Sequence, residues 1–199
     1  MTAPASNALH RRDVVAKLLR DRGGLLVVAG LGSSVWDCTA AGDNPMNFCL
    51  WGGMGLAAMT GLGLACAQPS RRVLVVTGDG EMLMGLGSLA TIGAQRPDNL
   101  AVVVVDNERY GETGMQKSHT AHGVDLAAIA AASGFPHARV VRDMAGVDAL
   151  RHDIHAAAGP IFAQVKVVAE KLPLVMPPRE GAHLKSRFRQ ALLGDSAFA

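Results

Sequence analysis

The feature that most constrains the fold is a set of short, valine-rich segments, each followed at once by glycine or acidic residues. Leu25–Ala29 reads LLVVA, Arg72–Thr77 reads RVLVVT and Leu100–Asp106 reads LAVVVVD. Unbroken apolar runs of this length are typical of strands that are buried on both faces, as in parallel sheets. Because segments with helical patterns separate these runs, the sequence predicts an α/β fold, a three-layer, doubly wound and mostly parallel sheet.

The rest of the chain continues the alternation of strands and helices. Helices are expected at Gly55–Ala67, Met82–Gln95, Val124–Ser133 and Gly146–Ala158, and further strands at Val140–Val141 and Ile161–Val168. One domain accounts for a chain of 199 residues, and we assign residues 1–170 to it. Residues 171–199 are expected as a C-terminal tail that packs on the domain or on a partner. Its basic amphipathic segment, residues 183–193, is expected as part of that tail or as a short terminal helix.

Charge and composition exclude several functional classes. The 19 Lys and Arg residues nearly balance the 17 Asp and Glu residues, which argues against nucleic acid or an acidic membrane surface as partner. Three cysteines without a CxxC motif argue against a disulfide framework and a cysteine-bound metal. Residues 1–12 contain no apolar signal segment, and the uncharged residues 50–67 are rich in glycine, which favours a buried helix over a membrane span. A cytoplasmic protein is therefore expected.

Two polar turns follow neighbouring predicted strands. Gly78-Asp79-Gly80 separates a strand from a helix, and Asn107 follows the next strand after 26 intervening residues. Glycine and a helix N-terminus allow an anion to approach the backbone, whereas a carboxylate beside that anion requires a cation such as Mg²⁺. One helix and one strand return the chain to the same sheet edge, so Asn107 can share this cation with Asp79. Taken singly, each motif is more often an ordinary turn.

The two motifs together resemble the signature of thiamine diphosphate (ThDP) enzymes. The resemblance implies that Asp79, Asn107 and the backbone carbonyl of Arg109 hold Mg²⁺, which bridges the diphosphate of the cofactor. The sequence departs from the family at Asp106, where an asparagine is common, and at Glu81, where a small residue is common. The role of Glu81 is left open between a side chain that points away and one that reaches the metal through water.

Further turns extend the resemblance. The segment Trp51-Gly52-Gly53-Met54-Gly55 resembles the turn that holds the aminopyrimidine. The resemblance implies that the Gly52 carbonyl accepts from the 4′-amino group and that Met54 supports the bent cofactor. The alternative for Met54 is an ordinary core residue at the start of a helix. Ser33 either binds diphosphate or caps a helix. The cofactor-binding residues predicted in this way are Gly32, Ser33, Gly52, Met54, Gly78, Asp79, Gly80, Glu81, Asn107, Tyr110 and Gly111.

The order of these turns is similar to that in the decarboxylase branch of the family, as in sulfopyruvate and phosphonopyruvate decarboxylases. Members need a pyrimidine-binding domain whose glutamate activates the cofactor, and one 199-residue domain does not supply it. The resemblance implies a hetero-oligomer in which a pyrimidine-domain (alpha) subunit carries this glutamate, and a small anionic 2-oxo acid as substrate. No catalytic residue is assigned within this chain. The beta subunit of a 2-oxo acid oxidoreductase and a non-catalytic ThDP-binding protein are the alternatives.

Basic residues after Asn107 are candidates for holding the anionic end of the substrate. They are Arg109, Lys117, His119 and His122. Sulfonate, phosphonate and carboxylate groups prefer cationic or N–H partners. Ordinary solvated loop positions are the simpler interpretation of each, so their role is left open, as is that of the tail.

Overall fold

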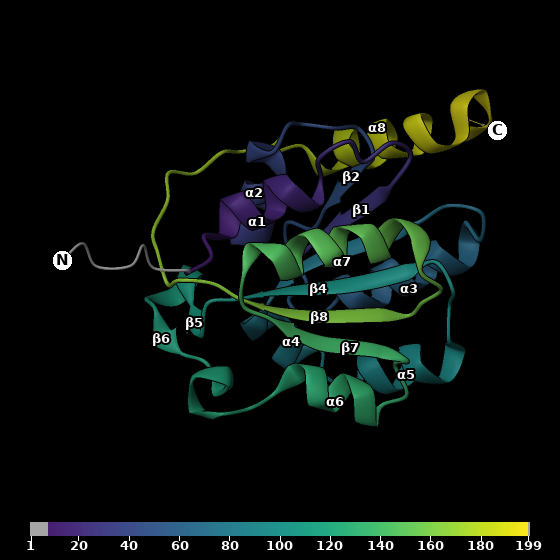
Figure 1. Cartoon of the computed structure of the whole chain (residues 1–199). Helices are drawn as coiled ribbons and strands as arrows, with labels where there is room; N and C mark the ends of the chain where they lie inside the picture. Colours follow the sequence, from purple (N-terminus) through teal and green to yellow (C-terminus); the bar gives the residue numbers. More distant parts are fainter. Residues whose placement is uncertain (1–7, 199) are drawn as a thin grey trace.

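A six-stranded sheet forms the centre of the molecule in the computed structural model, which describes residues 8–198 (Figure 1). All neighbouring strands run parallel, in the order β2-β1-β3-β4-β8-β7. The strands are β1 (Leu26–Ala29), β2 (Asn47–Cys49), β3 (Val73–Gly78), β4 (Leu100–Asp106), β7 (His137–Val141) and β8 (Ile161–Lys166). The predicted α/β fold with a parallel sheet is confirmed. Residues 1–7, part of the segment expected to lack a secretory signal, lie outside the described residues.

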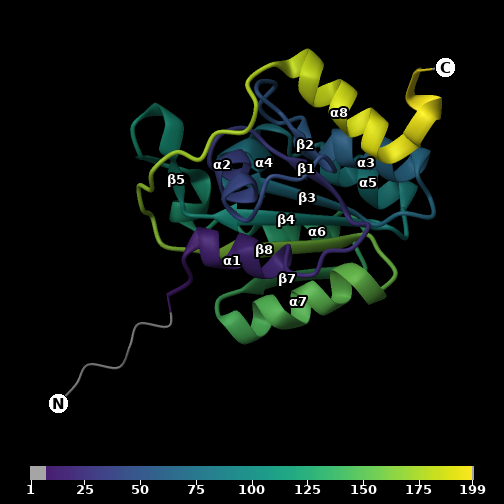
Figure 2. The same ribbon diagram turned by 90° about the horizontal axis from the view of Figure 1, so that it is seen from above.

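Helices cover both faces of the sheet, which gives three layers (Figure 2). One face packs against α1 (Arg11–Leu18), α2 (Ser33–Ala40) and α7 (Met144–Ala156), and the other against α3 (Ala57–Ala67), α5 (Ser88–Gln95) and α6 (Leu126–Ala132). Successive strand residues point to opposite faces. Val27 and Ala29 therefore join the first core, whereas Leu26 and Val28 join the second. Burial on both sides explains why these strands are apolar without alternation.

One predicted helix proved to be two. The segment Met82–Gln95 was expected as a single helix, but the structure has α4 (Asp79–Met84) and α5, separated near Gly85. At Gly85 the chain passes so close to Gly55 that an added Cβ would lie 2.2 Å from the Gly55 carbonyl oxygen. This backbone contact requires glycine and diverts the helix. The helices α1 and α2 and the strand β2 had no sequence-based prediction of their own.

The C-terminal segment contains α8 (Gly181–Leu193), which packs against the edge strand β2 and is followed by a short 3-10 helix (Gly194–Phe198). Its buried residues Leu184 and Phe188 join the cores on the two faces of the sheet. Arg187 donates two hydrogen bonds to the carboxylate of Asp43, at 2.6 and 3.0 Å, and anchors the helix beside the loop before β2. The basic segment is therefore helical, with its apolar side against the domain.

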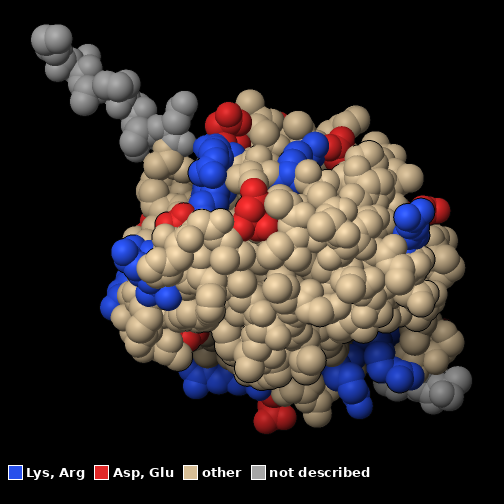
Figure 3. All heavy atoms as spheres, turned by 90° about the horizontal axis from the view of Figure 1, so that it is seen from below, with Lys and Arg blue, Asp and Glu red and all other residues tan. Residues whose placement is uncertain are grey.

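Within residues 8–198, no helix combines the length and the apolar character that a bilayer crossing requires. The uncharged segment at residues 50–67 instead contains the 11-residue α3, whose buried side packs on the sheet. Among the described residues, basic and acidic side chains are separated around a broad uncharged area on the face seen from below (Figure 3). That face shows no continuous basic stripe.

A close approach between two helices gives a test of the packing. A Cβ on Gly93 in α5 would lie 1.8 Å from the backbone oxygen of Ser133, at the end of α6. We expect Gly93→Ala to lower the free energy of unfolding by about 1–3 kcal/mol through overpacking. Gly63→Ala is the matched control, because Gly63 lies in α3 with nothing within 4 Å of an added Cβ. Denaturant unfolding of both variants measures the difference; equal stabilities would contradict this description of the packing.

Candidate functional site

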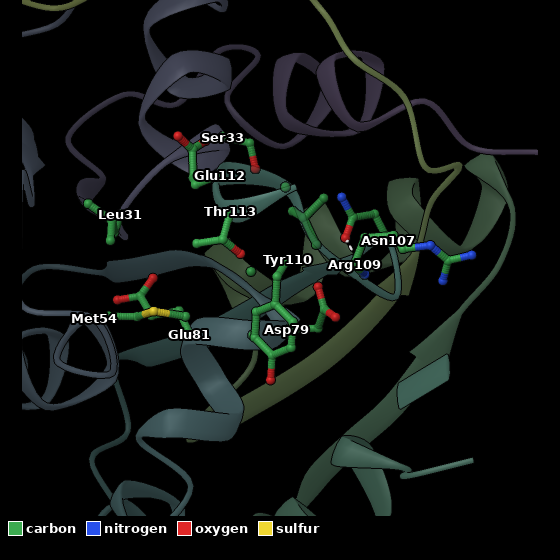
Figure 4. A pocket seen from close by; sticks show the side chains of 14 residues that line it. Leu31, Ser33, Met54, Asp79, Glu81, Asn107, Arg109, Tyr110, Glu112 and Thr113 are labelled. Carbon is green, nitrogen blue, oxygen red and sulfur yellow. Dashed lines mark hydrogen bonds between the residues drawn. The ribbon is translucent and has the colours of Figure 1, made fainter. Parts of the chain in front are cut away.

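The carboxyl ends of β1, β3 and β4 open into a cavity of about 140 Å³ (Figure 4). Parallel strands bring these turns to one edge, where ligands bind in folds of this kind. Of the predicted residues, those that line the cavity are Ser33, Met54, Gly78, Asp79, Gly80, Glu81, Asn107, Arg109, Tyr110 and Gly111. Gly32 and Gly52 do not line it. Sequence reasoning missed four lining residues, which are Leu31, Val105, Glu112 and Thr113.

Asp79 places a buried carboxylate at the wall of this cavity, with 2% of the residue exposed. Its Oδ2 atom accepts hydrogen bonds from the hydroxyls of Ser118 and Thr120. Burial raises the pKa of Asp79 to about 6, and the nearby charge of Asp106 acts in the same direction, while the two hydroxyls oppose it. Among the described residues no cationic side chain pairs with Asp79. A bound cation would therefore stabilise its ionised form.

Asp106, the departure from the family pattern, belongs to a buried polar network rather than to the cavity wall. Its Oδ2 atom accepts hydrogen bonds from Gln164 at 2.6 Å and from Lys166 at 2.9 Å. Its Oδ1 atom accepts from Thr120 at 2.8 Å and from the backbone N–H of Glu108 at 2.9 Å. Lys166 also pairs with Glu108 at 2.5 Å. The carboxylate thus balances a lysine and orders the turn that presents Asn107.

A short hairpin borders the cavity on the Asn107 side. It pairs β5 (Arg109–Tyr110) with β6 (Gln116–Lys117). The ring of Tyr110 lies over Gly80, where an added Cβ would be 2.5 Å from a ring carbon. Because the ring occupies the place of a side chain, position 80 requires glycine. Asn107 Oδ1 accepts from the backbone N–H of Arg109 at 2.9 Å, while the guanidinium of Arg109 points away from the cavity (Figure 4).

The turn before α3 brings Met54 to the opposite side of the cavity. Gly53 and Gly55 have φ of +72° and +89°, a conformation that favours glycine. Gly55 contacts Gly85 backbone to backbone. The turn is thereby fixed against the end of α4, which begins with Asp79. Met54 and Asp79 thus line the same cavity although 24 residues lie between them in the chain.

Glu81 is also buried, and its carboxylate is held by protein groups. Thr77 donates its hydroxyl to Oε2 at 2.6 Å, and the backbone N–H of Ala57 donates to Oε1 at 3.3 Å. Burial raises the pKa of Glu81, against the opposing effect of these hydrogen bonds and of the backbone at Gly55 and Leu31. Sequence reasoning left the orientation of this side chain open.

Other candidates occupy the rim or lie further away. Lys117, His119 and His122 do not line the cavity, although the Tyr110 hydroxyl lies 3.4 Å from His119 Nδ1. Glu112, which carried no sequence signal, extends from the hairpin toward Gly32 at the N-terminus of α2. The described residues contain no group of three or more His, Cys, Asp or Glu side chains arranged for a metal. The candidate ligands are instead one carboxylate, one amide oxygen and one backbone carbonyl.

Comparison with protein families shows to which family the chain belongs. Residues 33–165 match the family described as thiamine pyrophosphate enzyme, C-terminal TPP binding domain. The chain belongs to this family of thiamine pyrophosphate enzymes. Membership confirms the predicted resemblance and the prediction that the chain is part of an enzyme, and it supports thiamine diphosphate as the cofactor. The matched range includes every candidate ligand of the metal.

Individual relatives carry related names. The chain is 42% identical over 142 residues to sulfopyruvate decarboxylase subunit beta of Methanothermobacter thermautotrophicus, covering 71% of this chain and 73% of that subunit. It is 38% identical to phosphonopyruvate decarboxylase of Streptomyces viridochromogenes over 92% of this chain, but spans only 44% of that relative. The crystal structure of benzoylformate decarboxylase from Polynucleobacter necessarius shares the fold, with a TM-score of 0.69 at 20% identity over 88% of this chain and 36% of that one.

The ion pair of Asp106 with Lys166 gives a test of the polar network. We expect Lys166→Met to lower the free energy of unfolding by about 3 kcal/mol, because it leaves a buried carboxylate without its cation. The double variant Asp106→Asn/Lys166→Met should recover most of this loss. Lys185→Met, at an exposed position of α8, is the control with the same change of residue. Urea titration measures all four proteins, and equal stability of the single and double variants would contradict the pairing.

Proposed function

We propose that this chain is the diphosphate-binding subunit of a ThDP- and Mg²⁺-dependent 2-oxo acid decarboxylase of the sulfopyruvate or phosphonopyruvate type. The observation that carries the proposal is the meeting of Asp79, Asn107 and Met54 around one cavity. The names of the relatives indicate the reaction class. A partner subunit supplies the pyrimidine domain and its activating glutamate, so each active site forms between two chains.

The donor set of this chain suits Mg²⁺. The metal prefers hard oxygen ligands and takes few protein carboxylates, with phosphate oxygens completing its shell. Asp79 offers a buried carboxylate without a cationic partner among the described residues, and Asn107 offers an amide oxygen on the same cavity. The backbone carbonyl of Arg109 is the third proposed ligand. When bound, thiamine diphosphate supplies an electron sink for the pair of electrons left behind as carbon dioxide departs.

The remaining lining residues have binding and orienting roles. Gly32 and Ser33 lie at the N-terminus of α2, whose free N–H groups favour an anion such as the diphosphate. Met54 and the Gly52 carbonyl orient the aminopyrimidine from the opposite side. The ring of Tyr110 packs over Gly80 beside the proposed metal ligands.

Three exposed apolar side chains beside the Met54 turn mark the surface that the partner would cover. Leu56 is 54% exposed, Met59 39% and Met84 68%. A Cβ added to Gly55 would lie 3.2 Å from the backbone carbonyl carbon of Met84, so the end of α4 lies beside the turn that leads through Leu56 into α3. Exposed apolar clusters of this kind are typical of interaction sites. This surface adjoins the Met54 side of the cavity, the side on which we place the pyrimidine domain.

The activity is tested by co-expressing the chain with a pyrimidine-domain subunit and supplying ThDP and Mg²⁺. Carbon dioxide release from sulfopyruvate or phosphonopyruvate, absent without the partner, is the expected result. Turnover by the isolated chain would refute the split site. Turnover that requires an electron acceptor would favour the oxidoreductase. Tight ThDP binding without turnover on any 2-oxo acid would favour a non-catalytic binding protein.

Asp79→Asn tests the metal site. The variant keeps size and burial but weakens the negative charge that holds Mg²⁺. We expect the affinity of the complex for Mg²⁺ and ThDP to fall by about 100-fold. Calorimetric titration measures both affinities, and thermal unfolding checks that the variant is folded. Unchanged Mg²⁺ affinity would contradict the assignment of Asp79 as a ligand.

Met84→Asp tests the partner surface. A charge in the middle of an apolar contact should prevent assembly, because it would be buried without a counter-ion. We expect the chain to remain folded and to migrate alone in size-exclusion chromatography with the partner. Leu193→Asp, at the end of α8 on the β2 side, is the control and should assemble normally. Normal assembly of the Met84 variant would place the interface elsewhere.

A further inference from the structure

Glu81 connects three segments that are distant in sequence. Its carboxylate accepts from the Thr77 hydroxyl at the end of β3 and from the N–H of Ala57 at the start of α3. It also fills the space next to Gly30 at the end of β1, where an added Cβ would lie 1.9 Å from Oε2. Only 4% of Glu81 is exposed, so its carboxylate is surrounded mainly by protein groups and not by solvent.

Helix α3 depends on this contact at its first turn. The residue before the helix, Leu56, provides no side-chain hydrogen bond to the exposed N–H groups. An uncapped helix N-terminus carries partial positive charge, and a carboxylate there is stabilising. Glu81 supplies this carboxylate from α4, a different helix. The start of α3 is therefore fixed by a residue of the GDG turn region.

We propose that Glu81 is a positioning residue, which fixes the turn at residues 52–57, and with it Met54, against the ends of β1 and β3. The carboxylate does this by accepting from Ala57 and Thr77 on two different elements. Gly30 is glycine because this side chain occupies the place of a Cβ. Only the consequence for the cofactor rests on the proposed function: a displaced Met54 would hold the aminopyrimidine poorly.

Hydrogen exchange of the full chain tests the positioning without any cofactor. In Glu81→Ala, we expect the exchange of peptide 52–60 to rise at least about ten-fold relative to α7. In Glu81→Gln, the exchange of the same peptide should stay within about three-fold of the wild-type rate. The amide oxygen of Gln can accept from Ala57 while its NH₂ group donates to Thr77. Leu126→Ala, a fully buried position of α6, controls for lost stability and should not change the ratio, because α6 packs mainly on β7, β8 and α5 rather than on α3. An unchanged ratio in Glu81→Ala would overturn the proposal.

A double-mutant cycle keeps the proposal testable if Glu81→Ala folds poorly. Gly30→Ala places a methyl group where the Glu81 carboxylate lies, so it should be costly in the wild type and much less so in the Glu81→Ala background. Melting temperatures of the four proteins measure the coupling. Equal effects in both backgrounds would overturn the assigned contact.

Measuring ThDP binding by the complex with its partner separates the positioning role of Glu81 from the proposed function of the chain. We expect the Kd for ThDP to rise by about ten-fold in Glu81→Ala and to be restored in Glu81→Gln. Absence of ThDP binding by the wild-type complex would overturn the proposed function, while the exchange experiment would still decide the role of Glu81. Wild-type affinity in Glu81→Ala would overturn the link between Glu81 and the cofactor.

Discussion

The parallel register of β3 and β4 determines where the polar groups of the site lie. Gly78 pairs with Val105, so the residues that follow them, Asp79 at the start of α4 and Asp106 at the end of β4, lie next to each other. The hydroxyl of Thr120 contacts both carboxylates and thereby joins the two turns. Since a shift by one residue would turn each of these side chains to the opposite face, the buried valines that fix the register also fix the site.

Three buried carboxylates near the cavity differ in how their charge is balanced. Lys166 neutralises Asp106, whereas hydroxyl and backbone donors hold Glu81. Asp79 accepts hydrogen bonds from two hydroxyls, and burial raises its pKa to about 6. Of the two departures from the family pattern, Asp106 belongs to the buried network, and Glu81 lines the cavity but is held by protein donors. Asp79, at the position common to the family, has no cationic partner among the described residues.

Sequence alone predicted much of the sheet and most of the cavity, because both depend on local signals. Apolar runs mark the buried strands, and the turns that follow them must meet at one edge. The division of Met82–Gln95 into two helices was not predicted, since it depends on the contact of Gly85 with Gly55, which lie far apart in the chain. Glu112 and Thr113 were missed for a related reason: only the folded hairpin brings them to the cavity.

The position of α8 has a consequence for how the molecule behaves at high concentration. A bare edge strand offers unpaired backbone groups to any neighbouring chain. Here the last helix lies along β2 and buries Leu184 and Phe188 beside it, with Arg187 tied to Asp43. Helix α8, which lies beyond the C-terminal end of the matched family range, therefore protects this edge from pairing with another chain. Its removal would lead first to aggregation, even where the cavity at the other end of the strands kept its shape.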